Sequence, residues 1–87
     1  MYTLEIYSRD NCSYCQMAKK VLNGKGVEYK EYDVTQDSIL ADEMRKRSSQ
    51  LSVPQIFLNY EHIGGFEDMM KVIRDGSFSQ KLNNTME

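Results

Sequence analysis

Apolar and polar residues alternate at the start of the chain, and this alternation predicts a β-strand over about residues 2–8. The repeat then lengthens to that of a helix, with apolar residues expected on one face and lysines on or near the other. The apolar set is Tyr14, Ala18, Val21 and Leu22, and the lysines are Lys19, Lys20 and Lys25. The helix is predicted to end at Gly24-Lys25-Gly26, because glycine readily takes the left-handed conformation that closes a helix.

The middle of the chain predicts an edge strand followed by a second helix. Residues 27–34 mix tyrosine and valine with charged side chains, which is typical of a strand at the edge of a sheet. Asp37 or Ser38 can then cap a helix that runs to about Arg47 or Ser48.

The last third of the chain predicts a hairpin and a third helix. Residues 53–58 form an apolar run that predicts a strand started by Pro54 and buried on both faces. Asn59-Tyr60 is expected to turn the chain into an antiparallel partner at residues 61–63. Helical spacing then places further apolar residues on the inner face of a helix that ends at Asp75-Gly76. These residues are Phe66, Met69, Met70 and Ile73, and Phe78 and Leu82 are expected to dock a last short helix.

The predicted order of elements is β-α-β-α-β-β-α with a helical tail, within a single domain that spans residues 1–87. A strand, a helix and a second strand in such a short stretch form a right-handed crossover, so the first two strands are expected to be parallel. The fold class is therefore α/β, with a mixed four-stranded sheet flanked by helices on both faces. The first helix begins at the carboxyl end of the first strand, where open α/β sheets bind ligands.

Composition and charge narrow the function classes. The chain is 40% hydrophobic and 28% charged with a net charge of -2, which suits a soluble globular protein and argues against nucleic acid as a partner. Arg45-Lys46-Arg47 is interpreted as the solvated end of a helix. No apolar run approaches the roughly 18 to 20 residues of a membrane span, and no signal peptide is evident, so a cytoplasmic location without membrane partners is expected. The polar tail at residues 83–87 is expected to be disordered.

Cys12 and Cys15 are the only cysteines, and they lie where the predicted strand gives way to the predicted helix. Half of a zinc site is one interpretation, but structural zinc takes about four ligands and His62 is the only histidine. A structural disulfide is another, but so short a loop removes little entropy from the unfolded chain. Reversible redox chemistry remains, and it fits a cytoplasmic protein.

The two-residue spacing suits thiol-disulfide exchange. Near the first turn of a helix, free backbone N–H groups and the positive end of the helix dipole favour a thiolate at Cys12. Cys15 lies one turn further on and can reach Cys12. Arg9 adds a positive charge that favours the thiolate, and Asp10 opposes it if it lies close. The motif thus offers a nucleophile at Cys12 and a resolving thiol at Cys15.

The sequence resembles the glutaredoxin family over nearly its whole length. The resemblance implies a thioredoxin-like fold in which the peptide bond before Pro54 is cis, although only about 5 to 6% of X-Pro bonds are cis in folded proteins. That proline would face the active cysteine. The motifs that carry the resemblance are Tyr7-Ser8-Arg9 with Cys12-Ser13-Tyr14-Cys15, then Ser52-Val53-Pro54-Gln55-Ile56-Phe57, and then Gly64-Gly65-Phe66-Glu67-Asp68.

The resemblance also implies a glutathione site. Cys12 would be the nucleophile and Cys15 the resolving thiol, and Val53 would bond the glutathione backbone as a strand partner. The N-terminus of the third helix would hold the γ-glutamyl carboxylate, and an acidic side chain would meet the ammonium group. Arg9 would lie near the glycine carboxylate or the thiolate. The implied glutathione-binding residues are Arg9, Tyr14, Ser52, Val53, Pro54, Gly65, Phe66, Glu67 and Asp68.

Several positions depart from the usual residues of the family and leave alternatives open. Ser13 stands where a proline is more common. Tyr14 and Phe66 can face the groove, or they can belong to the apolar faces of their helices. Glu67 and Asp68 can simply complement the helix dipole, and which of the two meets the glutathione ammonium is open.

The sequence therefore predicts a glutathione-dependent thiol-disulfide oxidoreductase. It is expected to act as a monomer on protein disulfides and glutathionylated proteins, with glutathione as co-substrate and no metal bound by a single chain. The resemblance leaves one alternative from another class, because some glutaredoxins bind a 2Fe-2S cluster between two protomers, and a serine in place of the motif proline is compatible with this. A thioredoxin fits less well, since the chain has no tryptophan and no Trp-Cys-Gly-Pro-Cys motif.

Overall fold

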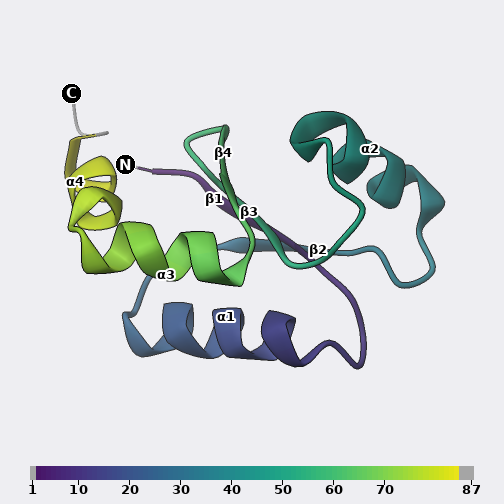
Figure 1. Cartoon of the computed structure of the whole chain (residues 1–87), viewed down its shortest axis with the longest axis horizontal. Helices are drawn as coiled ribbons and strands as arrows, with labels where there is room; N and C mark the ends of the chain where they lie inside the picture. Colours follow the sequence, from purple (N-terminus) through teal and green to yellow (C-terminus); the bar gives the residue numbers. More distant parts are fainter. Residues whose placement is uncertain (1, 85–87) are drawn as a thin grey trace.

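The computed structural model describes residues 2–84, which form a four-stranded sheet with helices on both faces (Figure 1). The strands are β1 (Leu4–Ser8), β2 (Lys30–Asp33), β3 (Gln55–Leu58) and β4 (Glu61–Gly64), and the helices are α1 (Ser13–Gly24), α2 (Ser38–Ser48), α3 (Phe66–Arg74) and α4 (Ser77–Asn84). The predicted α/β class and order of elements are confirmed. Of the tail predicted to be disordered, residues 83 and 84 belong to α4 and residues 85–87 lie outside the described part of the chain.

The sheet has the order β2-β1-β3-β4, with β1 parallel to β2 and antiparallel to β3. As predicted, β2 is an edge strand, but it begins at Lys30 rather than at residue 27. Strand β3 is buried along its length, and it starts one residue after Pro54. Asn59 and Tyr60 have φ of 54° and 69°, the pair of positive angles that closes a two-residue hairpin between β3 and β4.

Successive residues of the central strands serve two cores, because strand side chains alternate between the faces of a sheet. One core lies between the sheet and α1, α3 and α4, and it contains Leu4, Ile6, Ala18, Leu22, Ile56, Leu58, Met69 and Phe78. The other lies under α2 and contains Tyr7, Val34, Met44 and Phe57. Burying such side chains contributes about 1.5 to 3 kcal/mol each, so the two cores fix α1 and α2 on opposite faces. Within residues 2–84, no helix is long and apolar enough to cross a membrane.

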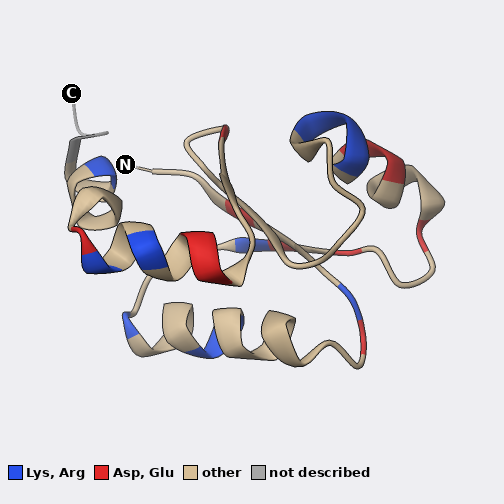
Figure 2. Cartoon of the chain, viewed as in Figure 1, with Lys and Arg blue, Asp and Glu red and all other residues tan. Residues whose placement is uncertain are grey.

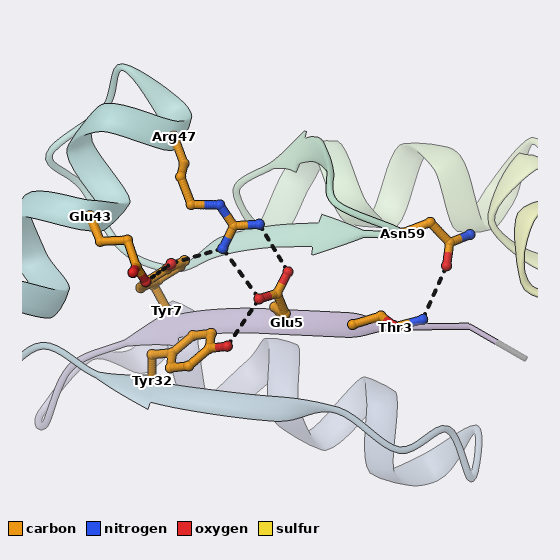
Figure 3. Close-up of polar contacts among 7 residues, drawn as sticks. All are labelled: Thr3, Glu5, Tyr7, Tyr32, Glu43, Arg47 and Asn59. Atoms are coloured by element: carbon orange, nitrogen blue, oxygen red, sulfur yellow. Dashed lines mark hydrogen bonds and ion pairs between the residues drawn. The ribbon is translucent and has the colours of Figure 1, made fainter.

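The basic end of α2 differs from its prediction as a solvated cluster. Figure 2 marks the basic residues at the end of α2. Arg45 pairs with Asp42 on the helix surface, but Arg47 turns onto the sheet (Figure 3). Its Nη2 lies 2.9 Å from Oε1 of Glu5, and its Nη1 donates to the Tyr7 hydroxyl over 2.8 Å. Glu5 is nearly buried in β1, and a carboxylate removed from water requires a cation or other hydrogen-bond donors. This requirement brings Arg47 out of solvent.

Lys19 also lies closer to the buried face of its helix than predicted. Its side chain is only 20% exposed, and its Nζ lies 2.8 Å from Oε2 of Glu31 in β2. Because α1 packs across β1 and β2, a long side chain near the edge of its buried face can reach a carboxylate on the sheet. Pairing with Glu31 therefore holds Lys19 against the sheet, whereas helix periodicity alone places lysines in solvent.

Candidate active site

Cys12 is the N-cap residue of α1, and its extended backbone has φ of -115° and ψ of 107°. Its sulfur accepts a hydrogen bond from the backbone N–H of Cys15 over 3.2 Å. The preceding residue, Asn11, has a φ of 57°, in the left-handed region that asparagine tolerates better than most residues. The sulfur of Cys12 thus lies at the free N–H groups of the first helical turn, which stabilise negative charge there.

The two thiols are in different environments. Both are free, but Cys12 is half-buried whereas Cys15 is fully buried in the first turn of α1. Burial raises the pKa of the Cys15 thiol well above its usual range, and the hydrogen bond with Cys12 raises it further. A backbone hydrogen bond with Arg9 and the charge of Lys19 act in the opposite direction. Of the two cysteines, only Cys12 can meet a substrate sulfur at the surface.

A groove of about 260 Å³ adjoins Cys12 and is formed by the start of α1, the loop before β3 and the start of α3. Its lining residues are Tyr14, Ser52, Val53, Pro54, Gly65, Phe66, Glu67 and Asp68. The structure therefore brings together eight of the nine residues that the family resemblance implied for glutathione. The ninth, Arg9, is exposed in the loop after β1 and does not line this groove.

The loop before β3 forms the wall of the groove next to the nucleophile. The peptide bond between Val53 and Pro54 is cis, as the resemblance implied. The Cys12 thiol donates to the Val53 carbonyl oxygen over 3.8 Å. The backbone N–H of Val53 has no hydrogen-bond partner within residues 2–84, so it can pair with an extended peptide in the groove.

Two aromatic rings form the apolar part of the groove. The ring centroids of Tyr14 and Phe66 lie 5.8 Å apart, with Tyr14 contributed by α1 and Phe66 by α3. Tyr14 is 52% exposed, so it belongs to the groove and not to the buried face of its helix. Phe66 lines the groove and also packs against the larger core, so both interpretations of this residue hold.

The N-terminus of α3 forms the far end of the groove, and Gly64 allows its close approach. Gly64 has a φ of +128°, and a Cβ atom there would clash with the Asp68 carboxylate. That carboxylate accepts a hydrogen bond from the Gly65 N–H over 3.3 Å and so caps the helix. The first turn of α3, starting at Phe66, lines the groove, and the free N–H groups of a helix N-terminus suit a carboxylate.

Gln55 is a residue of the site that the sequence interpretation missed. It is buried, its Nε2 donates to the Ser52 carbonyl oxygen over 3.0 Å, and its Oε1 lies 2.7 Å from Nε2 of His62. Both ends of the amide are therefore used to tie β4 to the loop that carries Val53. Burial lowers the pKa of His62, which favours the neutral ring that donates to Gln55. The signal was a polar residue within an otherwise apolar strand.

The sheet order, the dithiol at the start of α1 and the cis-proline loop facing it define a thiol-disulfide oxidoreductase with a thioredoxin-like fold. Within residues 2–84, no group of three or more His, Cys, Asp or Glu side chains could hold a metal ion.

Comparison with known proteins identifies the family. The family model described as glutaredoxin matches residues 4–63. The chain is 42% identical over 82 residues to glutaredoxin 3 of Escherichia coli K12, covering 94% of this chain and 99% of that protein. It is 38% identical over 84 residues to a glutaredoxin of Neisseria meningitidis, covering 95% and 99% of the two chains. A buckwheat glutaredoxin-glutathione complex matches with a TM-score of 0.85 at 27% identity, covering 95% of this chain and 78% of that one. The chain therefore belongs to the glutaredoxin family.

Proposed function

We propose that this protein reduces glutathione mixed disulfides and protein disulfides with glutathione as its reductant. The observation that carries the proposal is the asymmetry of the two thiols beside one groove. Cys12 is accessible and contacts Val53 in the groove wall, whereas Cys15 is fully buried one turn away. The match to a buckwheat glutaredoxin in complex with glutathione supports glutathione as the ligand.

The groove offers a complementary group to each end of glutathione. The cysteinyl backbone would pair with the N–H of Val53, which brings the glutathione sulfur to Cys12. The γ-glutamyl carboxylate would accept from the N–H groups at the start of α3. The ammonium group would meet the carboxylates of Glu67 and Asp68, both of which line the groove. Tyr14 and Phe66 would cover the apolar stem of the peptide.

The exchange needs only the two cysteines and glutathione. The Cys12 thiolate attacks the glutathione sulfur of a mixed disulfide, and the substrate sulfur leaves with the electron pair and takes up a proton. A second glutathione thiolate then attacks the glutathione sulfur bound to Cys12, which releases glutathione disulfide and restores Cys12. With a protein disulfide, Cys12 forms a mixed disulfide with the substrate, and Cys15 displaces the substrate thiol by forming the Cys12–Cys15 disulfide. Two glutathione molecules then reduce this disulfide to two thiols and leave as glutathione disulfide.

Turnover of a glutathionylated peptide tests this proposal. Cys12→Ser should abolish turnover, whereas Cys15→Ser should retain much of it and lose the reduction of protein disulfides. Replacing glutathione by cysteinylglycine, which lacks the γ-glutamyl group, should raise the KM for the reducing thiol several-fold. An active Cys12→Ser variant, or equal KM values for the two thiols, would contradict the assignment.

A further inference from the structure

A polar cluster on the sheet beneath α1 takes no part in the chemistry described so far. Lys19 donates from Nζ to Oε2 of Glu31 over 2.8 Å, and the Ser8 hydroxyl donates to the same oxygen over 2.6 Å. Ser8 is 1% exposed, so the carboxylate receives one of its partners from the protein interior. We call these three residues the Lys19 cluster.

The Lys19 cluster lies one helical turn from the resolving cysteine. Cys15 and Lys19 are four residues apart on α1, so their side chains are neighbours one turn apart on the same face of the helix. This face packs on the sheet, as the buried residues Cys15 and Ala18 show. Ile6 of β1 pairs with Glu31 of β2, so Ser8 and Glu31 lie on the same side of the sheet, under α1.

A positive charge near Cys15 favours its reactive form. A thiol attacks a disulfide as its thiolate, but burial raises the pKa of Cys15 and disfavours that form. Around Cys15, Cys12 adds to this effect, whereas the Arg9 backbone and the charge of Lys19 oppose it. The interaction is reciprocal, because the hydrogen bond to Glu31 and the charges of Glu31, Tyr29 and Cys15 raise the pKa of Lys19. Lys19 is thus the cationic side chain that acts on the buried thiol.

We propose that Lys19, positioned by Glu31 and Ser8, supplies the charge that allows the buried Cys15 to lose its proton and close the Cys12–Cys15 disulfide. This inference rests on the proposed role of Cys15 as the resolving thiol. Lys19 is a positioning residue in this scheme, because it acts on the reacting sulfur through its charge. The Ser8 hydroxyl also donates to Glu31 and holds its carboxylate in place. Because this hydroxyl is neutral, it does not change the net charge of the cluster.

The step conserves atoms and electrons. Cys15 releases its proton to solvent, and its thiolate attacks Sγ of Cys12 in the mixed disulfide. The bond between Cys12 and the substrate sulfur breaks, and the electron pair leaves with the substrate sulfur, which takes up a proton. The two protein thiols are oxidised to one disulfide, while the substrate disulfide is reduced to two thiols. Lys19 stays protonated throughout.

The two sulfurs can be followed separately with excess 4,4′-dithiodipyridine. Attack by Cys12 releases one thiopyridone at a rate proportional to the reagent concentration. Attack by Cys15 on the resulting mixed disulfide releases a second at a rate that does not depend on it. Stopped-flow absorbance over a range of pH therefore gives a separate pH profile for each thiol. Cys15→Ser should remove the second, concentration-independent phase, and its persistence would refute the proposed role of Cys15 itself.

Two charge-changing variants should displace the pH profile of the second phase in opposite directions. Lys19→Gln should displace its pH profile upward, whereas Glu31→Gln, which keeps an oxygen for Lys19 but removes the opposing charge, should displace it downward. Each pH unit of displacement lowers the thiolate fraction tenfold, but greater nucleophilicity recovers about threefold, so the rate at neutral pH should fall by about threefold per unit of displacement in Lys19→Gln. Lys19→Arg should restore the profile, and Lys20→Gln on the exposed side should leave it unchanged.

The outcomes separate a role in charge from a role in structure. Opposite displacements confined mainly to the second phase support the proposal. Displacements of both variants in the same direction, a Lys19→Gln profile equal to that of the unsubstituted protein, or a displacement of the Cys12 phase alone would overturn it. In each of these cases an intact second phase would leave the resolving role of Cys15 standing, so the two proposals fail separately.

Discussion

The Cys12 thiol contacts the carbonyl oxygen of Val53 over 3.8 Å, although 41 positions separate the two residues. The contact follows from the register of the sheet, in which Tyr7 of β1 pairs with Gln55 of antiparallel β3. The segment that leaves β1 and the segment that enters β3 must then meet at the same edge. The nucleophile and the wall of its groove are therefore coupled through the two central strands, and residues that hold these strands should affect the groove.

Gln55 should position the groove wall without touching the substrate. Gln55→Met keeps the volume of the side chain but leaves the Ser52 carbonyl and His62 without their partner. Losing such buried hydrogen bonds costs about 1 to 3 kcal/mol, which urea unfolding would measure. The KM for a glutathionylated peptide should rise more than kcat falls. Gln50→Met is a matched control at an exposed glutamine, and equal KM values in the two variants would argue against a role for Gln55.

Tyr14 should contribute to binding and little to stability. Because its ring is half-exposed, Tyr14→Ala should change the free energy of unfolding by less than about 0.5 kcal/mol. Loss of the ring that faces Phe66 should raise the KM for glutathionylated peptides several-fold. Met17→Ala removes a comparably exposed side chain of α1 that does not line the groove. A KM that rises equally in both variants would assign the effect to the helix and not to the groove.

Arg47 should stabilise the protein at the core that lies under α2. Arg47→Met leaves the nearly buried Glu5 without its cation and should cost about 2 to 4 kcal/mol, somewhat less than a fully buried pair because Arg47 is partly exposed. The variant that combines Glu5→Gln with Arg47→Met should recover part of this loss, since no charge is then left uncompensated. Thermal or urea unfolding of these two variants and of the unsubstituted protein measures both effects. A double variant less stable than Arg47→Met would contradict this explanation.

The ion pair of Lys19 and Glu31 should make stability depend on pH in the acid range. Hydrogen bonds from Lys19 and Ser8 hold the pKa of Glu31 below its ordinary value of 4.5. A depressed pKa means that the unfolded chain takes up the proton first, so the contribution is present above about pH 4.5 and is lost as the pH falls through the folded pKa. Glu31→Gln should show a shallower loss of stability on acidification. Parallel curves for the two proteins would show that Glu31 does not contribute.

The sequence predicted the positions of the elements well where the pattern was local. The strand before Cys12, the helix cap predicted at Asp37 or Ser38 and found at Asp37, and the hairpin turn at Asn59-Tyr60 are all present, although β1 is buried on both faces and does not alternate between buried and exposed residues. Helix periodicity places Lys19 on or near the side opposite the apolar residues, and the basic cluster predicts a solvated helix end at Arg47, but both side chains are largely removed from solvent. In each case a carboxylate on the sheet, contributed by a strand distant in sequence, draws the cation inward.

The sequence by itself determined the spacing of the two thiols, because the two residues lie within a few positions of each other. The order of the three motifs and the residues of the groove followed from the resemblance to the glutaredoxin family. Only the tertiary structure decided which thiol is accessible, that Gln55 holds the wall beside Cys12, and that Lys19 binds Glu31 on the sheet. The physical reason is that burial and charge pairing depend on which segments the sheet register brings together. A local pattern contains no information about a partner on another strand.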